Sequence, residues 1–163
     1  MRKTTQCYIS RIKGGAGIEE LLMLYRNKKP DDPNEGKWLG IGGKVEPGET
    51  PGEANIREVY EETGIRLEPD ACHFHGIIQF FNTVCEDEEI YLYSANVPEN
   101  TEFIECDEGE LHWIARDKIL DLNMWEGDKV FLEPLIAGKD RIDLALYYEG
   151  DNLVRVSRGC PTT

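Results

Sequence analysis

The chain has 163 residues, of which 32 are acidic and 18 basic, and its formal net charge is −14. This length is typical of one domain that buries roughly 70% of its unfolded surface, so we expect residues 1–163 to form a single domain. The acidic balance disfavours long nucleic acid and anionic membranes as partners, because both are bound through basic patches, but it accepts a small polyphosphate escorted by divalent cations.

Residues 4–10 and 19–26 are predicted to be strands, joined by a glycine-rich turn at residues 14–17. This turn lacks the Gly-Lys-Ser/Thr ending of a P-loop, so we interpret it as a hairpin rather than a phosphate cradle. The polar segment 27–37 contains two prolines and predicts a surface loop, which either borders the active site or is a plain connector.

A helix is predicted over residues 51–63. Thr50 and Glu53 have the spacing of a capping box, Pro51 stands at the first helical position, and Gly64 supplies the stop. The apolar residues of this helix lie on one side, where they are expected to pack against the rest of the domain.

The opposite side of this helix carries Glu58, Glu61 and Glu62 within one arc, because each residue turns the chain by ~100°. Three carboxylates this close repel one another unless a cation lies between them, and their oxygen atoms suit Mg²⁺ or Mn²⁺. The alternative is a solvated acidic face. Arg57 can bind both oxygens of the loop residue Glu49, which would brace the loop rather than contact a substrate.

Beyond this helix, strands are predicted near residues 72–81, 89–97 and 110–115, a helix over 125–137, and a final hairpin over 141–148 and 153–157. Strands flanking two helices predict an α/β fold with a sheet covered on both faces. His73 and His75 beside Cys72 could be a metal-ligand cluster, but alternate residues of a strand simply share one face, and we favour that interpretation.

Cysteine usage and hydropathy bear on the cellular compartment. The cysteines are odd in number and form no C-x-x-C pair, which favours reduced thiols. They are Cys7, Cys72, Cys85, Cys106 and Cys160. The segment MRKTTQCYIS lacks the apolar core of a signal peptide, and no stretch approaches the ~20 apolar residues that cross a bilayer. We therefore expect a cytoplasmic protein whose oligomeric state the sequence leaves open.

Residues 43–65 resemble the signature of the Nudix hydrolase family, G-x5-E-x7-R-E-U-x-E-E-x-G-U, in which U is a bulky aliphatic residue. The fixed positions are matched by Gly43, Glu49, Arg57, Glu58, Val59, Glu61, Glu62, Gly64 and Ile65. A match at so many positions is specific. The resemblance implies the Nudix α/β/α sandwich with a mixed β-sheet, and an enzyme that hydrolyses phosphoric anhydride bonds with Mg²⁺, for which Mn²⁺ can substitute.

By this resemblance, Glu58, Glu61 and Glu62 bind the metal, and the Gly43 carbonyl adds a ligand. A further acidic ligand is expected from a later loop, and Glu108 is the candidate, although it is also one acid among many in residues 102–110. Glu58 is the favoured general base and Glu61 the next, because the attacking water needs a nearby carboxylate. The sequence does not separate these two.

Residues 37–44, 123–136 and the closing strands are similar to the MutT-type 8-oxo-dGTP diphosphatases within this family. Trp125 offers a flat face for stacking on a purine, and Asp128 can accept the N1 and N2 protons of a guanine-like edge. Trp38 and Lys44 are further substrate-binding candidates. The alternative is that Trp125 fills the core and Asp128 caps the helix that follows.

Two departures from that group concern the base. The animal enzymes place two adjacent aspartates after the tryptophan, whereas this chain has Gly127-Asp128, and an asparagine after the first tryptophan is Leu39 here. Both changes remove polar contacts to the base, so the purine can sit differently or be discriminated less strongly.

The resemblance implies hydrolysis of 8-oxo-dGTP or a related oxidised purine nucleotide to the monophosphate plus pyrophosphate, as a step of nucleotide-pool sanitation and thus of DNA repair. A Nudix enzyme for ADP-ribose, a dinucleoside polyphosphate or the 5′ end of RNA is the first alternative, and the acidic balance argues against RNA. A nucleotide sensor without hydrolysis is the second, and the intact carboxylates argue against it.

Overall fold

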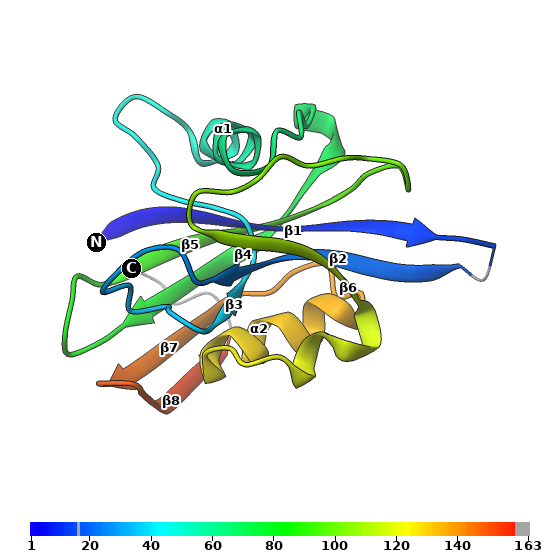
Figure 1. The fold of residues 1–163 in the computed structure, drawn as a ribbon. Coiled ribbons are helices and arrows are strands. Elements are labelled where there is room, and N and C mark those ends of the chain that lie inside the picture. Colours follow the sequence, from blue (N-terminus) through cyan, green and yellow to red (C-terminus); the bar gives the residue numbers. More distant parts are fainter. Residues whose placement is uncertain (16, 159–163) are drawn as a thin grey trace.

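The computed structural model describes residues 1–15 and 17–158, so Ala16 and residues 159–163, with Cys160, lie outside the described residues. The described strands form one mixed sheet in the order β3-β2-β1-β5-β4-β7-β8, with β6 paired to β2 (Figure 1). The pairs β1·β5 and β4·β7 are parallel, and the others are antiparallel. The strands are β1 (Arg2–Lys13), β2 (Ile18–Arg26), β3 (Trp38–Leu39), β4 (Cys72–Phe81), β5 (Glu88–Asn96), β6 (Gly109–Ala115), β7 (Leu144–Glu149) and β8 (Asn152–Arg158).

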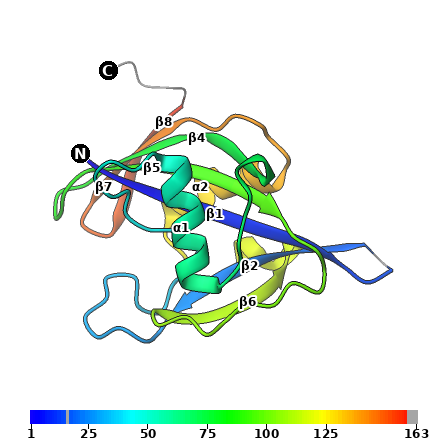
Figure 2. The ribbon, with the colours of Figure 1, turned by 90° about the horizontal axis from the view of Figure 1, so that it is seen from above.

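The two α-helices cover opposite faces of this sheet (Figure 1). Helix α1 (Pro51–Thr63) lies over β1 when the molecule is seen from above (Figure 2). Helix α2 (Glu126–Ile136) lies on the other face and follows a short 3-10 segment (Arg116–Asp121). A second 3-10 segment (Pro69–Ala71) leads into β4. The expected α/β sandwich with a mixed sheet is confirmed.

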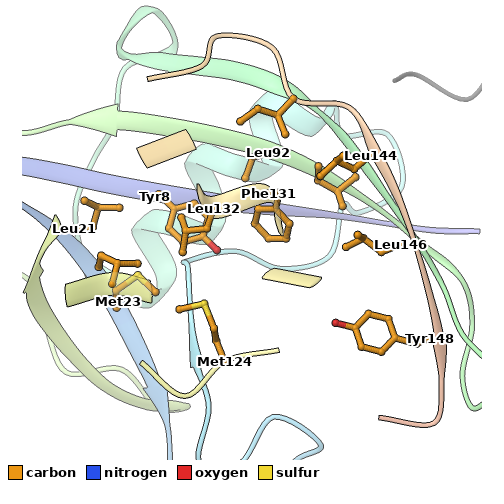
Figure 3. Packing of buried hydrophobic residues seen from close by; sticks show 13 residues of the cluster. Tyr8, Leu21, Met23, Leu92, Met124, Phe131, Leu132, Leu144, Leu146 and Tyr148 are labelled. Carbon is orange, nitrogen blue, oxygen red and sulfur yellow. The ribbon is translucent and has the colours of Figure 1, made fainter. Parts of the chain in front are cut away.

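Alternation along the strands supplies a separate core to each face. In β1, Cys7 and Ile9 are buried beneath α1, whereas Tyr8 is buried beneath α2. On the α2 face, Phe131 and Leu132 belong to a cluster with buried residues of five strands, among them Leu92 and Leu144 (Figure 3). Both faces of the central strands are therefore shielded from solvent, and each helix is held in place by burial of apolar surface.

Most predicted boundaries agree with the structure. Helix α1 begins at Pro51 and ends at Thr63 as expected, with both hydrogen bonds of the capping box formed and Gly64 in the left-handed conformation. The hairpin between β1 and β2 is present, with Gly17 N–H donating to Gly14 O at 3.2 Å. The two-residue strand β3 was not predicted, because two residues carry no periodic signal.

The loop 27–37 lies beside Glu108, the predicted metal ligand from the segment before β6, and this placement favours the interpretation that it borders the active site. Arg26 and Asp32 form an ion pair of 2.8 Å at its base, and Lys29 reaches Glu108 at 2.8 Å. Asn123 Nδ2 donates to Gly36 O at 2.8 Å, so the other end of the loop is tied to the segment that precedes α2.

None of the described helices is long and apolar enough to span a membrane. The cysteines in the described part, Cys7, Cys72, Cys85 and Cys106, are free.

Candidate active site

Arg57, in the middle of α1, is the centre of a charged network that joins this helix to the loop before it. Its Nε and Nη2 donate to the two carboxylate oxygens of Glu49 at 2.7 and 2.9 Å, and Nη2 also donates to Lys44 O at 2.9 Å. This fork ties the loop before α1 to the helix, which is the geometry expected for a brace. The hydrogen bond from Arg57 lowers the pKa of Glu49 to about 2, so Glu49 is ionised at neutral pH.

Arg57 also holds two of the predicted metal ligands. Its Nη1 donates to Glu58 at 2.8 Å and to Glu61 at 3.2 Å. Burial raises the pKa of Glu58, against the opposing effect of the Arg57 hydrogen bond. The Glu58 side chain is 16% exposed and that of Glu61 57% exposed, so Glu58 is the more protected carboxylate.

Gly43 lies directly against Glu58. A Cβ atom built at Gly43 would stand 2.4 Å from the Glu58 carboxyl carbon, so any side chain there would displace this carboxylate. The Gly43 carbonyl accepts the backbone N–H of Thr5 at 2.8 Å. The Thr5 hydroxyl donates to the same oxygen at 3.4 Å, so two hydrogen bonds tie this carbonyl to β1, and its role as a metal ligand stays a prediction.

Glu62 and Glu108 form a carboxyl pair, although they are far apart in the sequence. A hydrogen bond joins the two side chains, and Gly42 N–H donates to Glu62 at 3.1 Å. Burial, and next the hydrogen bond with Glu108, raise the pKa of Glu62 to about 9. Burial opposes ionisation of Glu108, but its hydrogen bonds with Lys29 and Glu62 lower the pKa of Glu108. One proton is therefore shared between these carboxylates.

The described residues contain no preformed group of three or more metal-binding side chains. The pairings explain this, since Arg57 engages Glu58 and Glu61 while Glu62 shares a proton with Glu108. The donor set still fits a hard divalent cation, because all these donors are oxygen atoms. The proton between Glu62 and Glu108 also lies where two neighbouring carboxylates would otherwise repel each other, and a cation would relieve the same repulsion. A small cleft of about 130 Å³ reaches Glu62 between β1 and the glycine segment 40–43.

Trp125 and Asp128 stand at the N-terminal end of α2. Trp125 Nε1 donates to Asn34 at 2.7 Å, and Lys37 Nζ lies 4.5 Å above the indole ring. Trp125 is the N-cap residue and α2 has no side-chain cap, so the alternative in which Asp128 caps this helix is wrong. Among the described residues none forms a hydrogen bond or ion pair with the Asp128 carboxylate, which is partly buried. Burial raises the pKa of Asp128 to about 7.

The structure explains the glycine at position 127. Gly127 N–H donates to the Tyr148 hydroxyl at 2.6 Å, and a Cβ atom at this position would stand 2.6 Å from the same oxygen. The side chain of an aspartate at this position would clash with Tyr148. The ring of Tyr148 also packs edge-on against Trp125, with 6.0 Å between the ring centroids, so this tyrosine helps to hold the indole in place.

The other two substrate candidates are placed differently. The Trp38 ring packs against Tyr25 and His112, at 5.0 and 5.6 Å between ring centroids, and Lys44 enters the network through its carbonyl oxygen. Four residues at the site were missed by the sequence reasoning. They are Arg26 and Lys29, which face Glu108, and Asn34 and Lys37, which contact Trp125. Their contacts connect distant segments, and no local pattern indicates them.

The model of the NUDIX domain matches residues 4–135 of the chain. The chain belongs to the Nudix family. It is 35% identical over 120 residues to the oxidized purine nucleoside triphosphate hydrolase of Danio rerio, covering 73% of this chain and 74% of that protein. The mouse protein of the same name is 32% identical over 105 residues, covering 64% and 65% of the two chains.

Among solved structures, the MutT protein of Bacillus halodurans superposes with a TM-score of 0.79, at 24% identity, covering 96% of this chain and 97% of that one. The likeness in fold therefore extends over nearly the whole chain. By its family model and its relatives this chain is a Nudix hydrolase, and helix α1 presents the predicted metal ligands Glu58, Glu61 and Glu62.

Proposed function

We propose that this Nudix hydrolase is a Mg²⁺-dependent nucleoside triphosphate diphosphatase that converts 8-oxo-dGTP or a related oxidised purine nucleotide to the monophosphate and pyrophosphate. The observation that carries the proposal is the Asp128 carboxylate, which lies in the first turn of α2, just after Trp125, and pairs with none of the described residues. An acceptor next to a flat aromatic face matches the N–H-rich edge and the π-face of a guanine-type base. The names of the animal relatives agree with this substrate class.

Glu58, Glu61, Glu62 and Glu108, with the Gly43 carbonyl as a further candidate, are the residues that would hold Mg²⁺ or Mn²⁺. When bound, the metal would neutralise the phosphate oxygens that otherwise shield the anhydride from attack. Before these carboxylates can bind the metal, the contacts of Arg57 with Glu58 and Glu61 and the hydrogen bond between Glu62 and Glu108 must open. Arg26 and Lys29, which face Glu108, add fixed positive charge on the same side.

Glu58 is the general base that the geometry supports best. It is less exposed than Glu61, and Arg57 fixes its orientation through a hydrogen bond of 2.8 Å. Its carboxylate would accept a proton from the water that attacks between the α and β phosphates. Burial raises the pKa of Glu58, which makes it a stronger base than a solvated glutamate.

Recognition of the base would rest on few polar contacts. Leu39 and Gly127 replace polar residues of the animal enzymes, so Asp128 is left as the acceptor, with the Lys37 ammonium above Trp125 as a nearby donor. A site with one strong acceptor discriminates bases less than a site with two. We expect a preference for oxidised purines that is weaker than two carboxylates would give.

The test is a comparison of kcat/KM for 8-oxo-dGTP, dGTP, ADP-ribose and a dinucleoside polyphosphate, with Mg²⁺ or EDTA, and with every product identified by chromatography. Preference for the oxidised nucleotide, release of pyrophosphate and loss of turnover in EDTA are the expected results. Preference for ADP-ribose or a dinucleoside polyphosphate would retain the Nudix glutamates and refute the base assignment. A role in cytoplasmic nucleotide-pool sanitation predicts in addition a higher spontaneous mutation rate when the gene is deleted.

A further inference from the structure

A second cleft, of about 420 Å³, opens on the α2 face of the sheet at the C-terminal end of α2. Its lining comes from β1, β2, β4, β5, Arg116, the last turn of α2 and the segment after it, and among the described residues that line it none lies within the signature at residues 43–65. Trp125 and Asp128 stand at the opposite end of the same helix. The volume falls within the range of roughly 300–1,000 Å³ that is usual for small-molecule sites. The proposed nucleotide hydrolysis makes no use of this cleft.

His75 and Ser94 form a hydrogen-bonded pair in the lining of this cleft. The His75 Nε2 atom lies 2.6 Å from Ser94 Oγ, and His75 Nδ1 lies 2.9 Å from the carbonyl oxygen of Asp140. Strand β4 carries His75 next to Ser94 of β5, and the bulge between Phe74 and Gly76 lies at this point of the pairing. The two histidines of the CHFHGIIQF segment therefore have an arrangement that alternation alone does not require.

The hydrogen-bond partners determine how the protons are placed in this pair. A carbonyl oxygen only accepts, so His75 Nδ1 carries the proton that it donates to Asp140. In the neutral ring Nε2 is then an acceptor, and the Ser94 hydroxyl donates to it. His75 is 7% exposed, and burial lowers its pKa, so the ring stays neutral at neutral pH. A hydroxyl, a neutral imidazole and a group that orients the imidazole are thus aligned.

We propose that Ser94 and His75 form a second reactive site, in which Ser94 is an activated nucleophile toward small uncharged esters. A nucleophile and base within about 2.6–3.2 Å, with the base oriented by a third group, are the structural signature of such a pair. Tyr8, Leu21 and Leu135 give the cleft an apolar wall for an acyl or aryl group.

Asn96 supplies the donor that a reacting carbonyl needs. Its Oδ1 accepts the Ser10 hydroxyl, and this orients the amide within the cleft. The Nδ2 protons of Asn96 form no hydrogen bond with the described residues and remain for the carbonyl oxygen of an ester. An amide in this role stabilises the negative oxygen of a tetrahedral intermediate.

The reaction follows from these positions. Ser94 Oγ bonds to the ester carbonyl carbon while its proton passes to His75 Nε2. The tetrahedral intermediate then collapses, the C–O bond to the alcohol breaks, and His75 returns the proton to the leaving oxygen. Water, deprotonated by His75, releases the carboxylic acid from Ser94 by the same two steps. No redox partner is involved, and the products are one acid and one alcohol for each ester and water consumed.

The test uses the full chain with a fluorophosphonate, which phosphonylates an activated serine with loss of fluoride, and with p-nitrophenyl acetate. We expect one phosphonyl group on the intact protein, located on Ser94 by peptide mapping, and p-nitrophenolate release at least about tenfold above that of Ser94→Ala. Ser157→Ala is the control, because it removes a serine hydroxyl of β8 that does not line this cleft.

Glu58→Gln should be labelled as fast as the wild type, and Ser94→Ala should keep nucleotide hydrolysis, which shows that it is folded. His75→Gln should lose labelling while retaining the thermal midpoint of the wild type. An unlabelled wild-type protein, label on a cysteine or lysine instead of Ser94, or equal ester hydrolysis by wild type and Ser94→Ala would each overturn the proposal.

Discussion

The contact between Gly127 and Tyr148 predicts a measurable coupling. In the variant Gly127→Ala, the new Cβ atom would stand 2.6 Å from the Tyr148 hydroxyl and 2.8 Å from Leu146 Cδ1. Both neighbours are at most 4% exposed and cannot move away freely. Overpacking of this kind costs about 1–3 kcal/mol. Loss of the hydrogen bond from Gly127 N–H would cost about 1 kcal/mol more. The higher helix propensity of alanine stabilises the helix by about the same amount, so these two contributions cancel.

The expected net loss for Gly127→Ala is therefore about 1–3 kcal/mol in the free energy of unfolding, or roughly 2–12 °C in Tm. The N-cap residue of α2 provides no side-chain cap, and the Tyr148 hydroxyl instead accepts the N–H of Gly127 in the first turn. Tyr148→Phe removes this acceptor and should cost about 0.5–2 kcal/mol. In the double variant Gly127→Ala/Tyr148→Phe the hydrogen bond is lost only once, and the closest clash disappears with the hydroxyl. The losses in free energy of unfolding of the two single variants should therefore add up to more than the loss of the double variant, by about 1 kcal/mol or more.

Urea unfolding of the four proteins of this cycle measures the coupling. Because α2 carries Trp125 and Asp128, the KM for the nucleotide should rise in Gly127→Ala while Glu58-dependent turnover changes less. Strictly additive costs, or a neutral Gly127→Ala, would refute the reasoning that Tyr148 requires a glycine at this position.

Three further predictions concern the charged residues of the site. Glu58→Gln should lower kcat by about 10²–10⁴-fold with an unchanged Tm, and retained turnover in stopped assays would remove Glu58 from the role of base. Arg57→Lys cannot form the two-pronged contact with Glu49, so kcat should fall about tenfold to a hundredfold, and NMR titration should show the pKa of Glu49 rising from about 2. Asp128 has a pKa of about 7 when folded against about 3.9 when unfolded, so its ionisation lowers stability as the pH rises from about 4 to 7. Asp128→Asn should therefore gain about 1–3 kcal/mol in denaturation at pH 8 and nothing at pH 4, and equal gains at both values would contradict the assigned pKa.

The part of the site that the sequence predicts is the part built from local signals. The capping box at Thr50, Pro51 at the first helical position and Gly64 at the end determine where α1 begins and ends, and helical geometry then places Glu58, Glu61 and Glu62 together. The contact of Arg57 with Glu49 spans eight residues and follows from the same helix.

Contacts between distant segments were not predictable in the same way. The carboxyl pair Glu62 and Glu108, the hydroxyl of Tyr148 on Gly127 and the pair His75 and Ser94 all depend on the order of strands in the sheet. The hydrophobic periodicity of the sequence predicts single strands but not the order in which they pair. The aspartate at position 128 showed the same limit, since a helix N-terminus favours a capping role from sequence, whereas Trp125 takes the N-cap position and leaves Asp128 without a partner.

The loop 27–37 contacts both halves of the candidate site, the predicted metal ligands and the predicted base site, and can therefore couple them. Lys29 holds Glu108 at 2.8 Å, while Asn34 holds the indole of Trp125 at 2.7 Å. A metal ion held by Glu62 and Glu108 would act on the end of this loop that carries Lys29, and a base stacked on Trp125 would act on the end that carries Asn34 and Lys37. Substitutions in the loop should therefore change the affinities for metal and for nucleotide together, which neither half of the site would require on its own.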